Sequence, residues 1–101
     1  MTNSKAMRDV WNERRRQIAF EGFTLEHDDV HTKKELAQAA ACYAMGDTGV
    51  KLEFNNGKKQ KVSFWPWNHT WWKPKSYREN LVRAGALIVA EIERLDRKAS
   101  Q

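Results

Sequence analysis

The hydrophobic positions of the chain follow helical spacing in three segments and alternate in a fourth. After a capping residue at Asn3 or Ser4, apolar residues recur every three to four positions and predict a helix to about Ala19. Its buried face is expected at Ala6, Met7, Val10, Trp11 and Ile18. On this pattern Trp11 is a core residue. Gly22 interrupts the pattern, and the acidic segment 23–31 predicts a loop or a single helical turn.

A second helix is predicted from Lys33 to Met45. Thr32 and Glu35 have the spacing of a capping box, in which each side chain accepts a hydrogen bond from the other residue's backbone amide. The helix is rich in alanine, which has high helix propensity and a side chain small enough to let another helix come close. Gly46 is the natural end of this helix.

The last helix begins after a second capping box, Ser76 to Glu79, and is expected to run to Leu95 or Arg97. Its apolar residues step by three and four, which predicts that this helix is the most buried element; they are Leu81, Ala84, Ile88, Ile92 and Leu95. Glycine costs about 1 kcal/mol against alanine inside a helix, so Gly85 indicates a close contact with another helix.

Residues 50–54 alternate between apolar and polar and predict a strand, with Lys61 to Phe64 returning as its partner. The sequence Asn55-Asn56-Gly57 between them suits a hairpin turn with positive φ angles. The two prolines between Trp65 and Lys75 argue against a regular element there. We therefore expect one mainly α domain over residues 1–101: a small three-helix domain with a β-hairpin insertion at about 48–64 and a Trp/Pro-rich loop.

Composition narrows the classes of function. The length of 101 residues suits one domain and is too short for a (β/α)₈ barrel or a full dinucleotide-binding fold. The single cysteine, Cys42, cannot form an internal disulfide and fits a reducing cytosol. Neither a membrane span nor a secretory signal is visible, so we expect a cytoplasmic protein that does not act at a membrane. A chain this small gains from association, and a homo-oligomer, most simply a dimer, is expected.

Tryptophan is the unusual component, because four of the five lie between residues 65 and 72. The surrounding segment from Lys51 to Arg78 carries seven positive residues against one negative, Glu53. Indoles stack on flat rings and cations bind phosphates, so this mixture suits a nucleotide-like anion. The alternative is that the tryptophans fill a small core.

The candidate ligand-binding residues follow from that chemistry. Trp67, Trp71 and Trp72 are expected to stack on a ring, and Lys73, Lys75 and Arg78 to contact phosphate. Arg78 also lies at a helix N-terminus, where backbone amides favour anions. Asp28, Asp29 and Asn80 are assigned to polar contacts with a base or ribose.

The acidic segment suggests a second kind of site. His27, Asp28, His31 and Glu35 are metal-ligating residue types at close spacing. The alternative is that Asp28 or Asp29 caps a turn and pairs with an arginine. The run Arg14-Arg15-Arg16 fans over about 200° of a helix and is more typical of a solvated face. No Gly-rich phosphate loop or nucleophile constellation is visible, which leans against an enzyme, and no cofactor is expected.

Several motifs together resemble a family of small, uncharacterised phage and prophage proteins over residues 10–97. They are Glu21-Gly22-Phe23-Thr24, Glu26-His27-Asp28-Asp29, Trp65-Pro66-Trp67, Trp72-Lys73-Pro74 and the stretch from Ala90 to Arg97. Trp11, Glu21 to Thr24 and His31 are also similar, more weakly, to the RyR domain, with Phe23 and Thr32 departing from its tryptophan and proline. The latter resemblance implies a nucleotide-type ligand.

The leading hypothesis is a phage-encoded, non-enzymatic binding protein. It would sequester a small nucleotide-like anion, such as a host immune signal of the cyclic nucleotide or ADP-ribose type. Three alternatives remain open at this point: a protein that inhibits a host enzyme through exposed tryptophans, a metal-dependent nucleotide hydrolase, and a binder of single-stranded nucleic acid. The last is disfavoured by the acidic residues of segment 21–35 and of the last helix.

Overall fold

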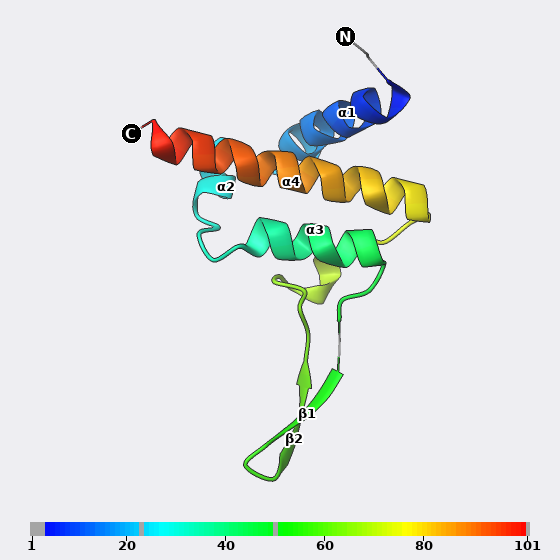
Figure 1. The fold of residues 1–101 in the computed structure, drawn as a ribbon, viewed down its shortest axis with the longest axis vertical. Coiled ribbons are helices and arrows are strands. Elements are labelled where there is room, and N and C mark those ends of the chain that lie inside the picture. The colour runs from blue at the N-terminus through cyan, green and yellow to red at the C-terminus, as the bar shows by residue number, and fades with distance from the viewer. Residues whose placement is uncertain (1–3, 23, 50, 101) are drawn as a thin grey trace.

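A computed structural model of the protein describes residues 4–22, 24–49 and 51–100. These residues form four α-helices, a short 3₁₀ helix and two strands, in the order α1 (Lys5–Phe20), α2 (Leu25–Asp29), α3 (Glu35–Met45), β1 (Lys51–Asn55), β2 (Lys58–Val62), η1 (His69–Trp71) and α4 (Tyr77–Ala99). The expectation of a mainly α fold is confirmed. The helices form the body of the molecule, and α4 lies between α1 and α3 (Figure 1).

The helix ends follow local sequence signals at four places. The Ser4 side chain accepts a hydrogen bond from the Met7 amide, and the Ser76 hydroxyl accepts one from the Glu79 amide, so α1 and α4 begin at their predicted caps. Gly46 ends α3 with a φ of 69°, the left-handed conformation that favours glycine. The acidic segment forms one helical turn, α2, which is capped by Thr24.

The capping box predicted at Thr32 is wrong. The Glu35 carboxylate accepts a hydrogen bond from the Lys33 amide rather than the Thr32 amide. Lys34 takes a left-handed φ of 67°, so residues 33 and 34 cannot form the first turn of the helix. Helix α3 therefore begins at Glu35, two residues later than the sequence predicts.

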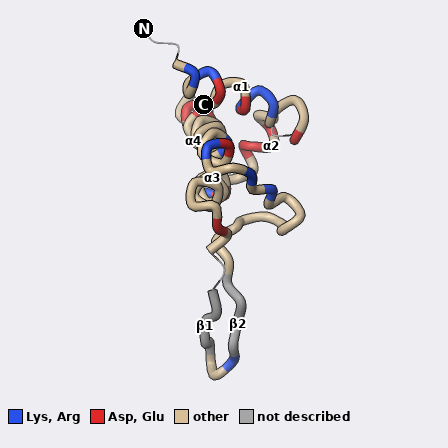
Figure 2. Tube along the Cα trace, turned by 90° about the vertical axis from the view of Figure 1, so that its right-hand side faces the viewer, with Lys and Arg blue, Asp and Glu red and all other residues tan. Residues whose placement is uncertain are grey.

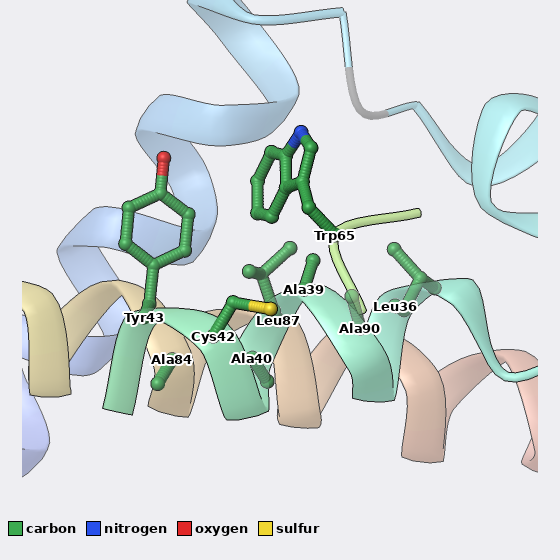
Figure 3. Close-up of a cluster of buried hydrophobic side chains, with 9 residues drawn as sticks. All are labelled: Leu36, Ala39, Ala40, Cys42, Tyr43, Trp65, Ala84, Leu87 and Ala90. Carbon is green, nitrogen blue, oxygen red and sulfur yellow. The ribbon is translucent and has the colours of Figure 1, made fainter. Parts of the chain in front are cut away.

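The core lies between α3 and α4 and is built largely from alanine. Its α4 side consists of Ala84, Leu87 and Ala90, and its α3 side of Leu36, Ala39, Ala40, Cys42 and Tyr43 (Figure 3). Trp65 packs beside Tyr43, with ring centroids 5.6 Å apart. The expectation that small side chains let another helix approach α3 is confirmed.

The predicted buried stripes of α1 and α4 are wrong for most of their large residues. Trp11 is 55% exposed, and Leu81, Ile88, Ile92 and Leu95 are between 41% and 52% exposed. Ala84 is the one residue of the predicted α4 stripe that is buried, and it is joined in the interior by Ala86, Leu87 and Ala90 of the neighbouring helix face. On α1 the buried positions are polar, Arg14 and Gln17, because this helix packs through an ion pair. The face of α4 that carries its large aliphatic side chains is therefore exposed on the surface of the domain.

Gly85 does mark a close helix contact. A Cβ atom at this position would lie 3.1 Å from Cγ2 of Val10, so α1 and α4 approach through the missing side chain. This contact was predicted from the glycine alone.

Strands β1 and β2 pair antiparallel, with Lys51 opposite Val62 and Asn55 opposite Lys58. Asn56 and Gly57 between them both have positive φ angles, 53° and 76°. Val50, the first residue of the predicted strand, lies outside the described residues. The two strands extend away from the helices (Figure 1). Within the described residues, no helix has the length and apolar character that crossing a membrane requires.

Candidate functional site

The segment after the strands is folded rather than loose. Trp65 donates a hydrogen bond from its indole Nε1 to the Asn68 carbonyl at 3.1 Å. The Asn68 side chain accepts one from the Thr70 amide at 2.9 Å and so caps η1. These two bonds fix the turn that carries Trp67 and Trp71.

Tyr43 ties this turn to helix α3. Its hydroxyl donates to the Trp71 carbonyl at 3.4 Å and accepts from the Lys73 amide at 3.2 Å. Trp72 packs against Tyr43 and Trp65, with centroid distances of 4.8 and 5.0 Å. Trp65 is therefore a core residue, and Trp72, like Trp67, is partly buried and packs against the core.

Two other tryptophans line an open cleft of about 360 Å³. Trp71 is 46% exposed, and Trp67 packs beside the His31 ring with centroids 5.3 Å apart. The remaining lining residues are Glu21, His27, His31 and Asn68. We call this the aromatic cleft. It brings together η1, the end of α1 and the segment from α2 to α3.

Lys73 lies beside the aromatic cleft. Its Nζ is 5.5 Å from the centre of the Trp71 ring, within the range of a cation–π contact. The carboxylate of Glu21, another lining residue of the cleft, is paired with Arg16 Nη2 at 2.8 Å. A cation therefore lies over one indole of the cleft, and the carboxylate in the lining is paired with an arginine.

The two histidines of the cleft converge. His27 Nε2 and His31 Nε2 are 3.4 Å apart. On its other side, His31 Nδ1 lies 3.4 Å from Glu35 Oε2, and His27 Nδ1 lies 3.5 Å from Asp28 Oδ1. Burial raises the pKa of Glu35, but hydrogen bonds from the Glu35 and Lys33 amides and from His31 outweigh it and leave this pKa below its ordinary value. The Glu35 carboxylate is therefore placed to orient the His31 ring.

The four predicted metal-ligating residues do not converge on one point. In the described part of the chain, no group of three or more His, Cys, Asp or Glu side chains is placed to hold a metal ion. Asp28 is committed elsewhere, because its Oδ2 accepts from Arg14 Nη2 at 3.0 Å in a fully buried pair. Arg14 also reaches Glu93. The alternative, that Asp28 pairs with an arginine, is therefore what the structure contains.

Arg14 was missed by sequence reasoning, which placed the run Arg14-Arg15-Arg16 on a solvated face. The run divides three ways: Arg14 is buried, Arg15 is exposed and Arg16 pairs with Glu13 and Glu21. The sequence did contain a signal for the burial of Arg14, because Arg14 lies four residues after Val10 and therefore shares the predicted buried face of the helix.

The other predicted ligand residues lie away from the aromatic cleft. Asn80 is buried and exchanges two hydrogen bonds with the Lys75 backbone, so it holds the start of α4. Asp29 pairs with Arg97 at 2.7 Å. Lys75 and Arg78 line a separate hollow of about 430 Å³ between α1 and α4. Of the nine predicted residues, Trp67 and Trp71 line the cleft, and Lys73 lies over the Trp71 ring beside it.

The hollow between α1 and α4 has mixed charge. Arg78 pairs with Asp9 at 2.9 Å. Hydrogen bonds from Lys5 and Arg78 hold the pKa of Asp9 below its ordinary value. Arg16 is held by Glu13, whose hydrogen bond raises the pKa of the guanidinium. Both signs of charge also occur along the helices as a whole (Figure 2). The basic excess of the chain therefore does not form a single anion-binding surface here.

Glu21 and Asn68 are cleft residues that the sequence did not single out. Asn68 follows Trp65-Pro66-Trp67 and precedes a short helical turn, where asparagine is a common cap. That signal locates the turn, although it does not reveal the cleft. Comparison of the chain with known protein families, with curated proteins and with solved structures finds no match.

Proposed function

We propose that the protein is a non-enzymatic binding protein for a small anion that carries a flat ring, of the nucleotide type. The observation that supports this proposal is the aromatic cleft, where the indoles of Trp67 and Trp71 and two imidazoles surround about 360 Å³. Ligand-binding pockets begin at about 300 Å³ and combine aromatic walls with a few polar groups. The cleft fits that description in size and in lining.

The half-exposed ring of Trp71 offers a face for stacking, which is worth about 1–3 kcal/mol per base. Asn68 offers its amide N–H₂ as a donor to a ring edge, while its Oδ1 accepts from the Thr70 amide. Lys73, over the Trp71 ring, supplies positive charge for a phosphate. Arg16 pairs with Glu21, which weakens the repulsion between that carboxylate and an anion.

The resemblance to small phage proteins extends the proposal to a biological role. A ligand of this kind would be a host immune signal, such as a cyclic nucleotide or an ADP-ribose derivative, which the protein would sequester in the host cytosol. In this proposal the paired strands are an insertion that the cleft does not need, because they extend away from the helices (Figure 1).

Isothermal titration against cyclic nucleotides and ADP-ribose isomers tests the proposal. At least one compound should bind more tightly than about 100 µM, which corresponds to about −5.5 kcal/mol. Trp71→Ala should weaken that binding about tenfold or more, whereas Trp71→Phe should keep most of it, since a ring remains. Lys73→Ala should also weaken it, and Lys75→Ala is the matched control because Lys75 lines the other hollow.

Failure of the whole panel to bind at 100 µM would end the proposal, as would unchanged affinity in Trp71→Ala.

A metal-dependent hydrolase is the second candidate, and the convergence of His27 Nε2 and His31 Nε2 at 3.4 Å favours it. Two imidazoles this close suit neighbouring ligand positions of a transition metal. Hydrolysis of compounds in the same panel in the presence of Zn²⁺ or Mn²⁺, if it is lost in His31→Ala and on chelation, would favour the hydrolase over the binding protein.

A further inference from the structure

A much smaller cavity adjoins the aromatic cleft. Its volume is about 10 Å³, which is room for a group of about the size of one water molecule. Three residues line both this cavity and the cleft, namely Glu21, Trp67 and Trp71. The remaining lining includes buried side chains of the interior, among them Gln17, Tyr43 and Leu87. We call this space the inner cavity.

The side-chain amide of Gln17, in the lining of the inner cavity, is held in one orientation. Its Nε2 atom donates a hydrogen bond to Glu13 Oε2 at 3.1 Å. Turning the amide over would set its oxygen against a carboxylate that can only accept, so the network fixes which atom is Oε1. Gln17 is 3% exposed, and its Oε1 is therefore a buried acceptor in a defined position.

In the described part of the chain, no group donates a hydrogen bond to this oxygen. Donors of the cavity lining are directed to other acceptors. The Tyr43 hydroxyl donates to the Trp71 carbonyl, and Arg83 Nη1 donates to the Lys73 carbonyl at 3.1 Å. Buried carbonyl groups in folded proteins nearly always have a donor, because leaving one unmatched is unfavourable. The inner cavity thus presents an acceptor that a donor from a ligand would complete.

We propose that Gln17 Oε1 accepts a hydrogen bond from an amino group on the edge of the ligand's ring, so that the protein selects amino-substituted rings of the adenine or cytosine type. This inference rests on the proposed function, because the ring must lie in the aromatic cleft. Trp71 lines both spaces, so a ring against its indole presents an edge to the inner cavity. A ring with a carbonyl at the same place would set two acceptors against each other.

The size and lining of the inner cavity decide which part of the ligand enters it. An amino group is a single nitrogen atom projecting from the ring, which matches a space for one water-sized group. A phosphate is larger, and the carboxylates of Glu13 and Glu21 in the lining would repel it. The phosphate therefore stays outside, on the side of Lys73, whose Nζ lies over the Trp71 ring.

Isothermal titration with matched pairs of nucleotides tests the selectivity. Cyclic AMP is compared with cyclic IMP, in which a carbonyl replaces the amino group, and cyclic CMP is compared with cyclic UMP. If ADP-ribose is the compound of the panel that binds, its hypoxanthine analogue is the second member of the pair. In at least one pair the amino compound should bind at least tenfold more tightly, which corresponds to about 1.4 kcal/mol. The pair that shows the preference distinguishes a purine ligand from a pyrimidine ligand.

The variant Gln17→Met keeps the length of the side chain and removes the acceptor. It should lower the affinity for the amino compound about tenfold and leave the affinity for the carbonyl compound unchanged, so that the preference disappears. A merely structural disturbance would weaken both compounds alike. Gln38→Met is the matched control, since Gln38 is an exposed residue of α3 and the full preference should remain. Circular dichroism compares the folds of the two variants.

The possible failures are distinguishable. Equal affinities of the wild type for the amino and carbonyl compounds would overturn the inference and leave the proposed function standing. A preference for the amino compound that persists in Gln17→Met would also overturn it, because another group would then recognise the amino nitrogen. If no compound of the panel binds, the proposed function fails and this inference fails with it.

Discussion

The guanidinium of Arg14 and the carboxylate of Asp28 form an ion pair of 3.0 Å in which the two residues are 1% and 0% exposed. This pair joins α1 to α2 where a hydrophobic contact would be expected. Removing one member of a buried pair leaves the other charge without compensation, whereas replacing both members by apolar residues can be neutral. Both members of the Arg14–Asp28 pair are therefore needed for the stability of the contact between α1 and α2.

Arg14→Met should lower the free energy of unfolding by about 3–5 kcal/mol, because Asp28 then stays buried without its cation. The Arg14→Met/Asp28→Leu variant should recover part of this loss. Urea unfolding followed by circular dichroism gives the values. Lys5→Ala is the control, since its pair with Asp9 is exposed and should change stability by less than about 1 kcal/mol. A loss of the same size in Arg14→Met and Lys5→Ala would contradict this account.

The contact of Gly85 with Val10 predicts a non-additive pair of substitutions. Gly85→Ala gains about 1 kcal/mol of helix propensity but places its Cβ 3.1 Å from Val10 Cγ2, so the net change should be small. In a Val10→Ala background the same substitution should stabilise by about 1 kcal/mol. Chemical denaturation of the four chains completes the cycle. Equal effects in both backgrounds would mean that the two helices are not in close contact at this point.

Acid should weaken the fold partly through Glu13. Burial raises the pKa of Glu13, but the hydrogen bond and charge of Arg16, with Gln17 and Arg83, outweigh it and hold this pKa below its ordinary value of 4.5. A folded-state pKa below the unfolded one stabilises the protein above pH 4.5, and this contribution is lost as the pH falls through the folded pKa.

The measurement compares urea midpoints at pH 7 and pH 3.5. Wild type should lose more stability between these two values than Glu13→Gln does. Glu26→Gln, a substitution at an exposed residue, should behave as wild type. An identical loss in wild type and Glu13→Gln would remove Glu13 from the explanation of acid sensitivity.

Cys42 should react slowly with thiol reagents in the native protein. Its side chain is fully buried, and burial together with the charge of Asp47 raises the pKa of the thiol, so little thiolate forms. Labelling with a chromogenic disulfide at pH 8 should proceed at least 100-fold faster in unfolding concentrations of urea than in buffer. Rapid labelling in buffer would indicate that the contact between α3 and α4 opens readily.

Local signals in the sequence located the helix ends well. Ser4, Ser76 and Gly46 act through hydrogen bonds or φ angles within a few residues, so their effect does not depend on the rest of the fold. The capping box at Thr32 does not form although its pattern was equally clear, because the Glu35 carboxylate accepts a hydrogen bond from the Lys33 amide instead.

The burial of particular side chains was less predictable. Spacing shows that Ile88 and Ile92 share a face, but not whether that face meets the chain's own core or another surface. Nor does composition distinguish the tryptophans: Trp65 lies in the core, Trp71 lines the cleft and Trp11 is exposed on α1. The cleft itself depends on long-range contacts, such as that between His31 and Trp67, which no local pattern encodes.

The two hydrogen bonds of the Tyr43 hydroxyl connect the turn of the aromatic cleft to the core helix α3. Tyr43 is packed among the buried residues of α3, and its hydroxyl holds the backbone on both sides of Trp72. The Lys73 amide, which donates to that hydroxyl, is therefore a site where hydrogen exchange reports on the cleft and on global unfolding together. A compound that occupies the cleft would slow exchange at this amide and raise the melting temperature of the whole domain, since binding and folding share one structural link.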